Sequence, residues 1–110
     1  MCIFCKIADG DIPANVLYES DRVMAFHDLE PQAPVHILII PKAHYENAAE
    51  LAAGDSQTLS ELFTSASAIA ADLALAGYRL VFNTGASAGQ SVFHAHLHLL
   101  AGRSFAWPPG

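Results

Sequence analysis

The sequence predicts an α+β domain in which a mainly antiparallel, five-stranded sheet carries one long and one short helix. Short apolar segments follow one another across short turns, which favours strands that pair as neighbours. One long segment with helical periodicity lies between them, and the final apolar segment alternates with histidines. A length of 110 residues fits one domain covering residues 1–110, and a hydrophobic fraction of 53% is enough for a core.

Five segments have the composition of β-strands. The first two form an expected hairpin around Ser20 and Asp21. The third is almost continuously apolar, as in a strand buried on both faces, and Pro41 ends it. The expected strands cover residues 15–19, 22–26, 36–41, 78–83 and 94–100.

The long helix is expected over residues 56–76, because apolar residues recur there at helical spacing. Asp55 or Ser56 is a suitable N-cap, and Gly77 supplies a stop. A shorter helix is expected at about residues 45–53. The long helix, or the other face of the sheet, offers a surface for a homodimer. The apolar stripe consists of Leu59, Leu62, Phe63, Ala66, Ile69, Ala70 and Leu73.

The charge distribution argues against nucleic acid as a partner. The net charge is −6, and the five fixed cations are scattered instead of forming a basic stripe. The start of the chain lacks the features of a signal peptide, and no apolar run approaches the roughly 20 residues that span a bilayer. We therefore expect a soluble, cytoplasmic protein with no membrane partner and with both cysteines reduced.

Histidines occupy alternate positions in the last expected strand. Because strand side chains alternate between faces, His94, His96 and His98 should share one face while Ala95 and Leu97 point to the other. Buried imidazoles need hydrogen-bond partners and are poor core material, but they serve well as nucleophiles, proton carriers or metal ligands. The pattern favours a reactive site over a half-buried strand that is merely rich in histidine.

A loop at residues 84–91 precedes these histidines and contains two glycines and three hydroxyl side chains. Glycine lets backbone N–H groups approach an anion closely. Such loops are usually ordinary turns, but this one is placed to hold a phosphate where the imidazoles point.

Residues 94–100 match the His-φ-His-φ-His-φ-φ signature of the histidine triad (HIT) superfamily of nucleotide hydrolases and transferases, where φ is an apolar residue. Within it the chain resembles the Hint branch of purine nucleoside phosphoramidases. The resemblance extends from about residue 3 to the end of the chain. The other segments that carry it are Phe26-His27-Asp28, Pro31-Gln32-Ala33-Pro34-Val35-His36, Ile40-Pro41-Lys42, Gly89-Gln90-Ser91-Val92 and Trp107-Pro108-Pro109-Gly110.

The resemblance implies a homodimeric, HIT-like fold and an enzyme that cleaves the phosphorus–nitrogen bond of purine nucleoside 5′-phosphoramidates. His96 would be the nucleophile that forms a nucleotidyl-histidine intermediate, from which water releases AMP or GMP. His98 would contact the phosphate and assist the leaving group, and His36 would support the triad from the neighbouring strand. His94 completes the implied catalytic set. No catalytic metal is required, because protonation lets the amine leave.

The resemblance also implies a substrate pocket. Asp28 matches a residue that binds the ribose hydroxyls, and Ser91 with the loop N–H groups would stabilise phosphoryl charge. Trp107 is the candidate for leaving-group selectivity, because the C-terminus of Hint dimers lies near the active site. Taken alone, Asp28 also fits a turn and the aromatic residues fit a core. The expected substrate-binding residues are Ile3, Phe4, Phe26, His27, Asp28, Asn83, Gly89, Gln90, Ser91 and Trp107.

Cys2 and Cys5 form a Cys-x-x-Cys motif, a spacing that suits a tetrahedral metal, although a structural zinc site needs four ligands. Many bacterial members of the superfamily bind zinc through two such cysteines and two histidines. The resemblance therefore implies structural Zn²⁺ on Cys2, Cys5, His44 and His94. The alternative is two reduced thiols beside a surface His44. A redox motif is disfavoured, because no helix visibly starts at the cysteines to lower a thiol pKa.

Three other functions stay open. A nucleotide-binding regulatory or adaptor protein would keep the pocket without turnover. A dinucleoside polyphosphate hydrolase would change the substrate, but the Hint-like tail and residues 31–34 argue against it. A small zinc-binding module would use the histidines as ligands, and it would leave Asp28 and the loop without a purpose.

Overall fold

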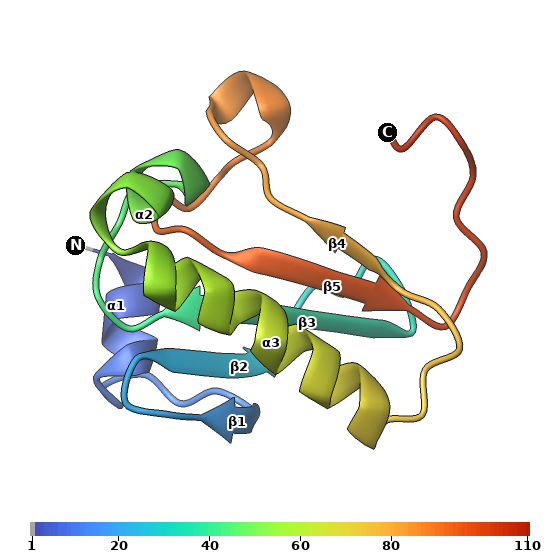
Figure 1. Cartoon of the computed structure of the whole chain (residues 1–110), viewed down its shortest axis with the longest axis horizontal. Helices are drawn as coiled ribbons and strands as arrows, with labels where there is room; N and C mark the ends of the chain where they lie inside the picture. The colour runs from blue at the N-terminus through green and yellow to red at the C-terminus, as the bar shows by residue number, and fades with distance from the viewer. Residues whose placement is uncertain (1) are drawn as a thin grey trace.

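The computed structural model describes residues 2–110, which contain a five-stranded sheet whose neighbouring strands are all antiparallel, in the order β1-β2-β3-β5-β4. Helix α3 crosses one face of the sheet, and the short helix α1 lies on the other (Figure 1). The predicted fold class is confirmed. The elements are α1 (Ile3–Ala8), β1 (Val16–Glu19), β2 (Val23–His27), β3 (Val35–Pro41), α2 (Ala48–Gly54), α3 (Ser56–Asp72), β4 (Arg79–Val81), η1 (Ala86–Ala88) and β5 (Leu97–Ala101).

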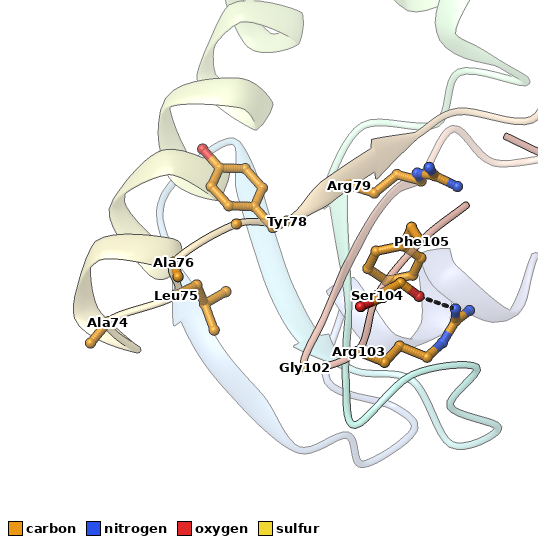
Figure 2. A pocket seen from close by; sticks show the side chains of 10 residues that line it. Ala74, Leu75, Ala76, Tyr78, Arg79, Gly102, Arg103, Ser104 and Phe105 are labelled. Carbon is orange, nitrogen blue, oxygen red and sulfur yellow. Dashed lines mark hydrogen bonds between the residues drawn. The ribbon is translucent and has the colours of Figure 1, made fainter. Parts of the chain in front are cut away.

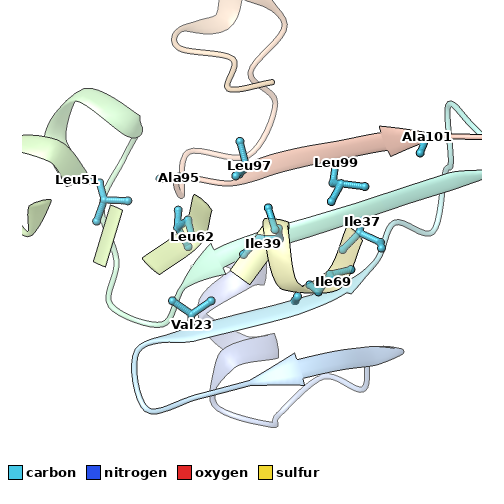
Figure 3. Close-up of a cluster of buried hydrophobic side chains, with 12 residues drawn as sticks. Val23, Ile37, Ile39, Leu51, Leu62, Ile69, Ala95, Leu97, Leu99 and Ala101 are labelled. Carbon is cyan, nitrogen blue, oxygen red and sulfur yellow. The ribbon is translucent and has the colours of Figure 1, made fainter. Parts of the chain in front are cut away.

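Strand β3 forms the middle of the core, as its apolar sequence predicts. Ile37 and Ile39 belong to the cluster under α3, whereas Leu38 and Ile40 belong to the cluster on the α1 side. Figure 3 shows the first cluster, where β2, β3 and β5 meet α2 and α3. Both faces of β3 are therefore removed from water, which supplies much of the hydrophobic stabilisation of a domain this small.

Helix α3 begins where the sequence predicts. The Asp55 carboxylate accepts hydrogen bonds from the Thr58 N–H at 3.1 Å and the Thr58 hydroxyl at 2.6 Å, so Asp55 is the N-cap. Two residues of the predicted apolar stripe, Phe63 and Leu73, are each 43% exposed. Phe63 lies at the edge of the stripe, and Leu73 follows the last helical residue.

The same helix ends earlier than predicted, at Asp72 instead of residue 76. Ala74 adopts a left-handed conformation with φ +54°, and the Leu75 N–H donates to the Ala70 carbonyl at 2.9 Å. These features close the helix in the way that usually requires glycine. Gly77 is therefore not the stop.

Helix α1 was not predicted. Cys2 is its N-cap, and the Cys2 sulfur accepts from the Cys5 N–H at 3.4 Å. The helix has six residues, of which Phe4 and Ile7 are buried against the second cluster. One helical turn capped by a cysteine leaves little periodicity to detect. The predicted short helix corresponds to α2.

The last strand is shorter than predicted, which changes where the histidines lie. Strand β5 begins after His96, so His94 and His96 occupy the irregular segment before it and only His98 lies within it. The Ala95 N–H donates to the Tyr45 carbonyl at 2.7 Å instead of joining the β3–β5 ladder. Strand β4 is likewise reduced to three residues. Among residues 2–110, no helix has the length and apolar character needed to span a membrane.

Candidate active site

Two imidazoles on the α1 side of the sheet, His36 and His98, form what we call the histidine pair. Strand pairing places Leu38 opposite His98, so His36 and His98 share this face. The Gln32 N–H donates to His36 Nδ1 at 3.0 Å, which leaves the proton of the neutral ring on Nε2. His36 Nε2 lies 2.9 Å from His98 Nδ1 and donates to it. The Gln32 backbone therefore sets the tautomers of both rings.

His98 consequently carries its own proton on Nε2. That nitrogen is buried and has no hydrogen-bond partner within residues 2–110. Burial, reinforced by His96 and His36, lowers the pKa of His98 to about 4, and burial also lowers the pKa of His36. Both rings are neutral at neutral pH, and the His98 Nε2–H is an unused donor beside His96, with ring centroids 4.9 Å apart.

Asp28 lies beside the histidine pair, just after β2. Its N–H donates to the His36 carbonyl at 3.0 Å, and its carboxylate accepts from the Glu30 N–H at 2.8 Å. The other carboxylate oxygen is 3.4 Å from His36 Nε2. The Asp28 side chain is 21% exposed, so lone pairs remain available to a ligand.

The His96 ring is oriented by the backbone of its own segment. His96 Nδ1 lies 2.7 Å from the His94 carbonyl. A carbonyl only accepts, so Nδ1 carries the proton and Nε2 keeps an unshared electron pair. Phe4 packs edge-on against this ring, with centroids 5.0 Å apart. A neutral imidazole with a free Nε2 is the state that nucleophilic attack requires.

His94 belongs to a second group, the thiol–imidazole cluster formed with Cys2, Cys5 and His44. Its Nε2 donates to the Pro41 carbonyl at 2.7 Å, which leaves Nδ1 unprotonated. That Nδ1 lies 3.3 Å from the Cys2 sulfur, 3.5 Å from the Cys5 sulfur and 3.2 Å from His44 Nδ1. All four donor atoms lie within 4.8 Å of one another and could hold a metal ion.

These separations fit a tetrahedral centre. Bonds of about 2.1 Å to nitrogen and about 2.3 Å to sulfur place neighbouring ligand atoms roughly 3.4–3.8 Å apart. The Cys5 sulfur and His44 Nδ1 are 3.3 Å apart, and the three His94 distances lie in a similar range. Two thiols and two imidazoles are also a donor set that structural zinc sites use.

The cysteines stand at the start of α1, contrary to the expectation that no helix begins there. A helix N-terminus usually lowers a thiol pKa. Here burial and the adjacent Cys2 raise the pKa of Cys5 to about 11. The expectation about the helix was wrong, but the Cys5 thiol still lacks the depressed pKa of a redox motif.

Asp28, His36 and His98 also lie close enough together to hold a metal ion. The Gln32 N–H, however, leaves the proton on His36 Nε2, the nitrogen that would have to bind the ion. Metal ligands must be deprotonated. This trio is therefore organised for hydrogen bonding.

The Gln90 side chain is buried and holds the loop at residues 84–91. Its Oε1 accepts from the Gly85 N–H at 2.9 Å, and its Nε2 donates to the carbonyls of Glu46 at 2.7 Å and Val92 at 3.1 Å. The amide is thus occupied within the protein, whereas Ser91 is exposed. Gln90 shapes this loop, and Ser91 is free to meet a ligand.

The other residues assigned to the pocket occupy different environments. Phe4 and Phe26 are buried and pack edge-on with centroids 5.7 Å apart. Ile3 is 48% exposed and His27 is partly exposed. The two phenylalanines are therefore part of the core on this side of the sheet, and Ile3 and His27 reach its surface.

Three other residues predicted to bind substrate, Asn83, Gly89 and Trp107, belong to neither the histidine pair nor the thiol–imidazole cluster. A Cβ on Gly89 would lie 3.8 Å from Asn83 Nδ2, so the loop folds back over the residues that follow β4. Gly89 has φ +95°, a conformation that favours glycine. Trp107 is 84% exposed, so its ring does not pack against the histidines of its own chain.

Three groups of the site could not be identified from the sequence: the Gln32 N–H and the carbonyls of Pro41 and His94. Backbone groups are present at every residue, so they leave no sequence signal. The one available hint is that Pro31 and Pro34 enclose Gln32 just before a histidine, which predicts a fixed loop.

Comparison with known proteins places these observations in context. Residues 9–105 match the family model described as HIT domain. An uncharacterized HIT-like protein of Synechococcus elongatus is 52% identical over 109 residues, covering 98% of this chain and 96% of the relative. A HIT family hydrolase from Legionella pneumophila is 48% identical, with TM-score 0.95 and 100% of both chains covered. A HIT family hydrolase from Clostridium thermocellum is 46% identical, with TM-score 0.91, covering 96% of this chain and 93% of that one.

Proposed function

Because the chain belongs to the HIT domain family, we propose that it hydrolyses the phosphorus–nitrogen bond of purine nucleoside 5′-phosphoramidates and releases a purine nucleoside monophosphate. Two structurally similar proteins are named hydrolases, which supports the general reaction class. The observation that carries the proposal is the state of His96. Its Nδ1–H is committed to the His94 carbonyl at 2.7 Å, so its Nε2 is free to attack.

In the first step His96 Nε2 attacks the α-phosphorus. The new nitrogen–phosphorus bond forms as the bond to the amine breaks, and the electron pair of the broken bond leaves with the amine nitrogen. The departing amine takes up a proton from water, because a neutral His98 that lost its Nε2 proton would become an imidazolate. The His98 Nε2–H, the donor beside His96, donates a hydrogen bond to a phosphoryl oxygen. The product is a nucleotidyl group on His96.

In the second step water attacks the same phosphorus. The water loses a proton to the solvent, and the electron pair of the phosphorus–His96 bond returns to His96 Nε2. The nucleoside monophosphate is then released and His96 regains its starting state. His36 keeps His98 in the required tautomer through the 2.9 Å hydrogen bond.

Substrate positioning follows from the groups around the histidines. The partly exposed Asp28 carboxylate is proposed to accept from the ribose hydroxyls. Phe26, His27 and Ile3 are proposed to contact the purine, and Ser91 with the loop N–H groups the phosphate. Holding the substrate in this way converts the attack by His96 into a reaction between neighbours.

Zinc is the metal we propose for the thiol–imidazole cluster. The support is the donor set and the 3.2–3.5 Å separations between Nδ1 of His94 and the other three donors. The ion would be structural, since it would tie the start of α1 to the segment that carries His94. It would bind the two cysteines as thiolates, balance their negative charge and stabilise the fold.

A homodimer is also part of the proposal. Phe63 on α3 is 43% exposed and packs against Phe82 with ring centroids 6.0 Å apart, which leaves an aromatic surface on this side. Trp107 would then approach the active site of the second copy. Light scattering of the purified protein should give the mass of a dimer, and Phe63→Glu should give that of a monomer.

The proposed reaction is tested by measuring AMP release from adenosine 5′-phosphoramidate. Wild type should turn over, His96→Ala should lose activity by on the order of 10⁴-fold or more, and a brief treatment with chelator should leave most activity. Quenched samples of wild type should carry one nucleotidyl group on His96. A wild type that binds AMP without turnover would overturn the proposal and favour a nucleotide-binding regulator.

A further inference from the structure

Two arginines and one aromatic ring hold the segment after β5 against the rest of the protein through non-covalent contacts. Phe105 lies between the guanidinium groups of Arg103 and Arg79, whose central carbons are 4.3 and 4.9 Å from the centre of the ring (Figure 2). Stacking on an aromatic face fixes the plane of a guanidinium. The directions of its N–H groups are fixed with it.

The two guanidinium groups bind different parts of the chain. Arg103 Nε donates to the Gln32 carbonyl at 3.2 Å, and a terminal nitrogen of Arg103 donates to the Ser104 carbonyl at 3.1 Å. Arg79 donates to the Ala106 carbonyl at 3.1 Å, within the C-terminal segment itself. Of the two, Arg103 is the one that reaches the loop before β3.

Gln32 connects Arg103 to the histidine pair. Its carbonyl accepts from Arg103, and its N–H donates to His36 Nδ1 at 3.0 Å. The carbonyl and the N–H lie in two rigid peptide planes joined at the Gln32 Cα, so with the carbonyl held only rotation about the Gln32 φ and ψ angles can redirect the N–H. A surface cation is thereby linked to the group that sets the tautomers of His36 and His98.

Gly102 brings the two segments together at a second point. It has φ +92°, and a Cβ at this position would lie 2.8 Å from Pro34 Cβ. The backbone after β5 therefore packs directly against the loop, two residues beyond Gln32. Arg103 follows Gly102 at once, so the same turn holds the loop by packing and by a charged hydrogen bond.

We propose that Arg103 is a positioning residue for the reaction, which holds Gln32 so that its N–H keeps the His36 proton on Nε2. The inference rests on the proposed function, in which the His98 Nε2–H must face the phosphoryl group. Arg103 does not touch the reacting atoms. A charged donor forms a stronger hydrogen bond than a neutral one, and its removal lets the loop shift and the second His36 tautomer become populated.

The test compares Arg103→Met with Arg79→Met in the full chain. Methionine keeps much of the aliphatic stem, and each variant removes one cation from Phe105, so the pair is matched. For each variant we would measure kcat and KM for adenosine 5′-phosphoramidate, the Kd of AMP, and the ¹⁵N signals of the imidazole nitrogens. The ¹⁵N signals report which ring nitrogen carries the proton.

We expect Arg103→Met to lower kcat by roughly 3- to 10-fold and to leave the Kd of AMP within about twofold. The His36 Nδ1 signal should move from its unprotonated position toward that of a mixture of tautomers. Arg79→Met should match wild type in kcat and in the His36 Nδ1 signal. Arg103→Lys, which keeps a charged donor, should recover part of kcat.

Equal losses in the two methionine variants would overturn the proposal, because they would show a merely structural effect of the C-terminal segment. Unchanged His36 signals in Arg103→Met would overturn it as well. These signals do not depend on turnover. A wild type without phosphoramidase activity would therefore refute the proposed function, while the tautomer of His36 would still decide the role of Arg103.

Discussion

The thiol–imidazole cluster and the trio formed by Asp28 with the histidine pair both bring metal-ligating side chains within 4.8 Å of one another. The backbone groups that contact their histidines have opposite hydrogen-bonding roles, an acceptor in one group and a donor in the other. The Pro41 carbonyl faces His94 and accepts a hydrogen bond from its Nε2–H, so the inward nitrogen is free to bind a metal. An N–H of Gln32 faces His36 and forces the proton inward. One backbone group thus separates a metal-type site from a proton-carrying site.

This difference teaches that residue types alone do not define a metal site. Both groups contain two histidines and additional acidic or thiol ligands. The deciding observation is which ring nitrogen remains unprotonated. Substitutions in one group should therefore affect chemistry and those in the other should affect metal binding.

A substitution in the histidine pair distinguishes the two groups directly. His36→Ala removes the donor that fixes His98, so kcat should fall by about 10²-fold, the size typical of a lost hydrogen bond to the group that carries charge in the transition state. The affinity for Co²⁺, followed by its visible absorption, should stay within about twofold of wild type. A loss of Co²⁺ binding in this variant would contradict the separation.

The reverse substitution should give the reverse result. Cys5→Ala removes one of four ligands from the thiol–imidazole cluster, so metal affinity should fall by more than about 10²-fold. The melting temperature should fall too, because a metal that binds the folded state stabilises it. Competition with a chromophoric chelator gives the affinity, and an unchanged value would exclude Cys5 as a ligand.

Acid should destabilise the protein through the histidine pair. Burial lowers the pKa of His98 to about 4 from an ordinary value of 6.5, so between these pH values the unfolded chain binds a proton that the folded chain does not. The stability is complete above pH 6.5 and is lost as the pH falls toward 4. The pKa of His36 is lowered in the same direction.

Urea denaturation at several pH values measures this dependence. The slope of the unfolding free energy against pH gives the number of protons taken up on unfolding. In this range His98→Gln should reduce that number by up to one. The same slope in wild type and variant would show that His98 does not carry the effect.

A substitution just after α3, outside both groups, should give the smallest effect and serves as a control for the others. Ala74 has φ +54°, which costs free energy for any residue with a Cβ. Ala74→Gly should raise the free energy of unfolding by about 0.5–1 kcal/mol and leave kcat and metal affinity unchanged. Denaturant titration provides the measurement, and a less stable variant would contradict the expected relief of strain.

The parts of the fold that follow from periodicity were predictable. Residues 37–40 predicted a strand buried on both faces, and Asp55 marked the start of α3. The end of α3 was not predictable, since Ala74 takes a conformation that its identity disfavours. The start of β5 was also missed, because the Ala95 N–H pairs with Tyr45, a contact that tertiary structure creates.

The candidate site also has features that the sequence predicts and features that it does not. The sequence, through its resemblance to the HIT family, named the side chains of both groups, and the structure brings Cys2, Cys5 and His44 to His94. Their individual roles stay predictions. What the sequence could not supply is the protonation pattern, because this depends on where the backbone of Gln32 and Pro41 lies in space.

The two contacts of His94 restrict how the amino-acid sequence of the N-terminal helix can change between relatives. The Nδ1 of His94 faces the cysteine sulfurs, while the His94 carbonyl accepts a hydrogen bond from His96 Nδ1 at 2.7 Å. A relative that loses the cysteines must give this fully buried ring nitrogen another partner, because leaving it unsatisfied is costly. It must do so without turning the carbonyl of the same residue, so substitutions in the N-terminal helix are constrained by the position of the nucleophile.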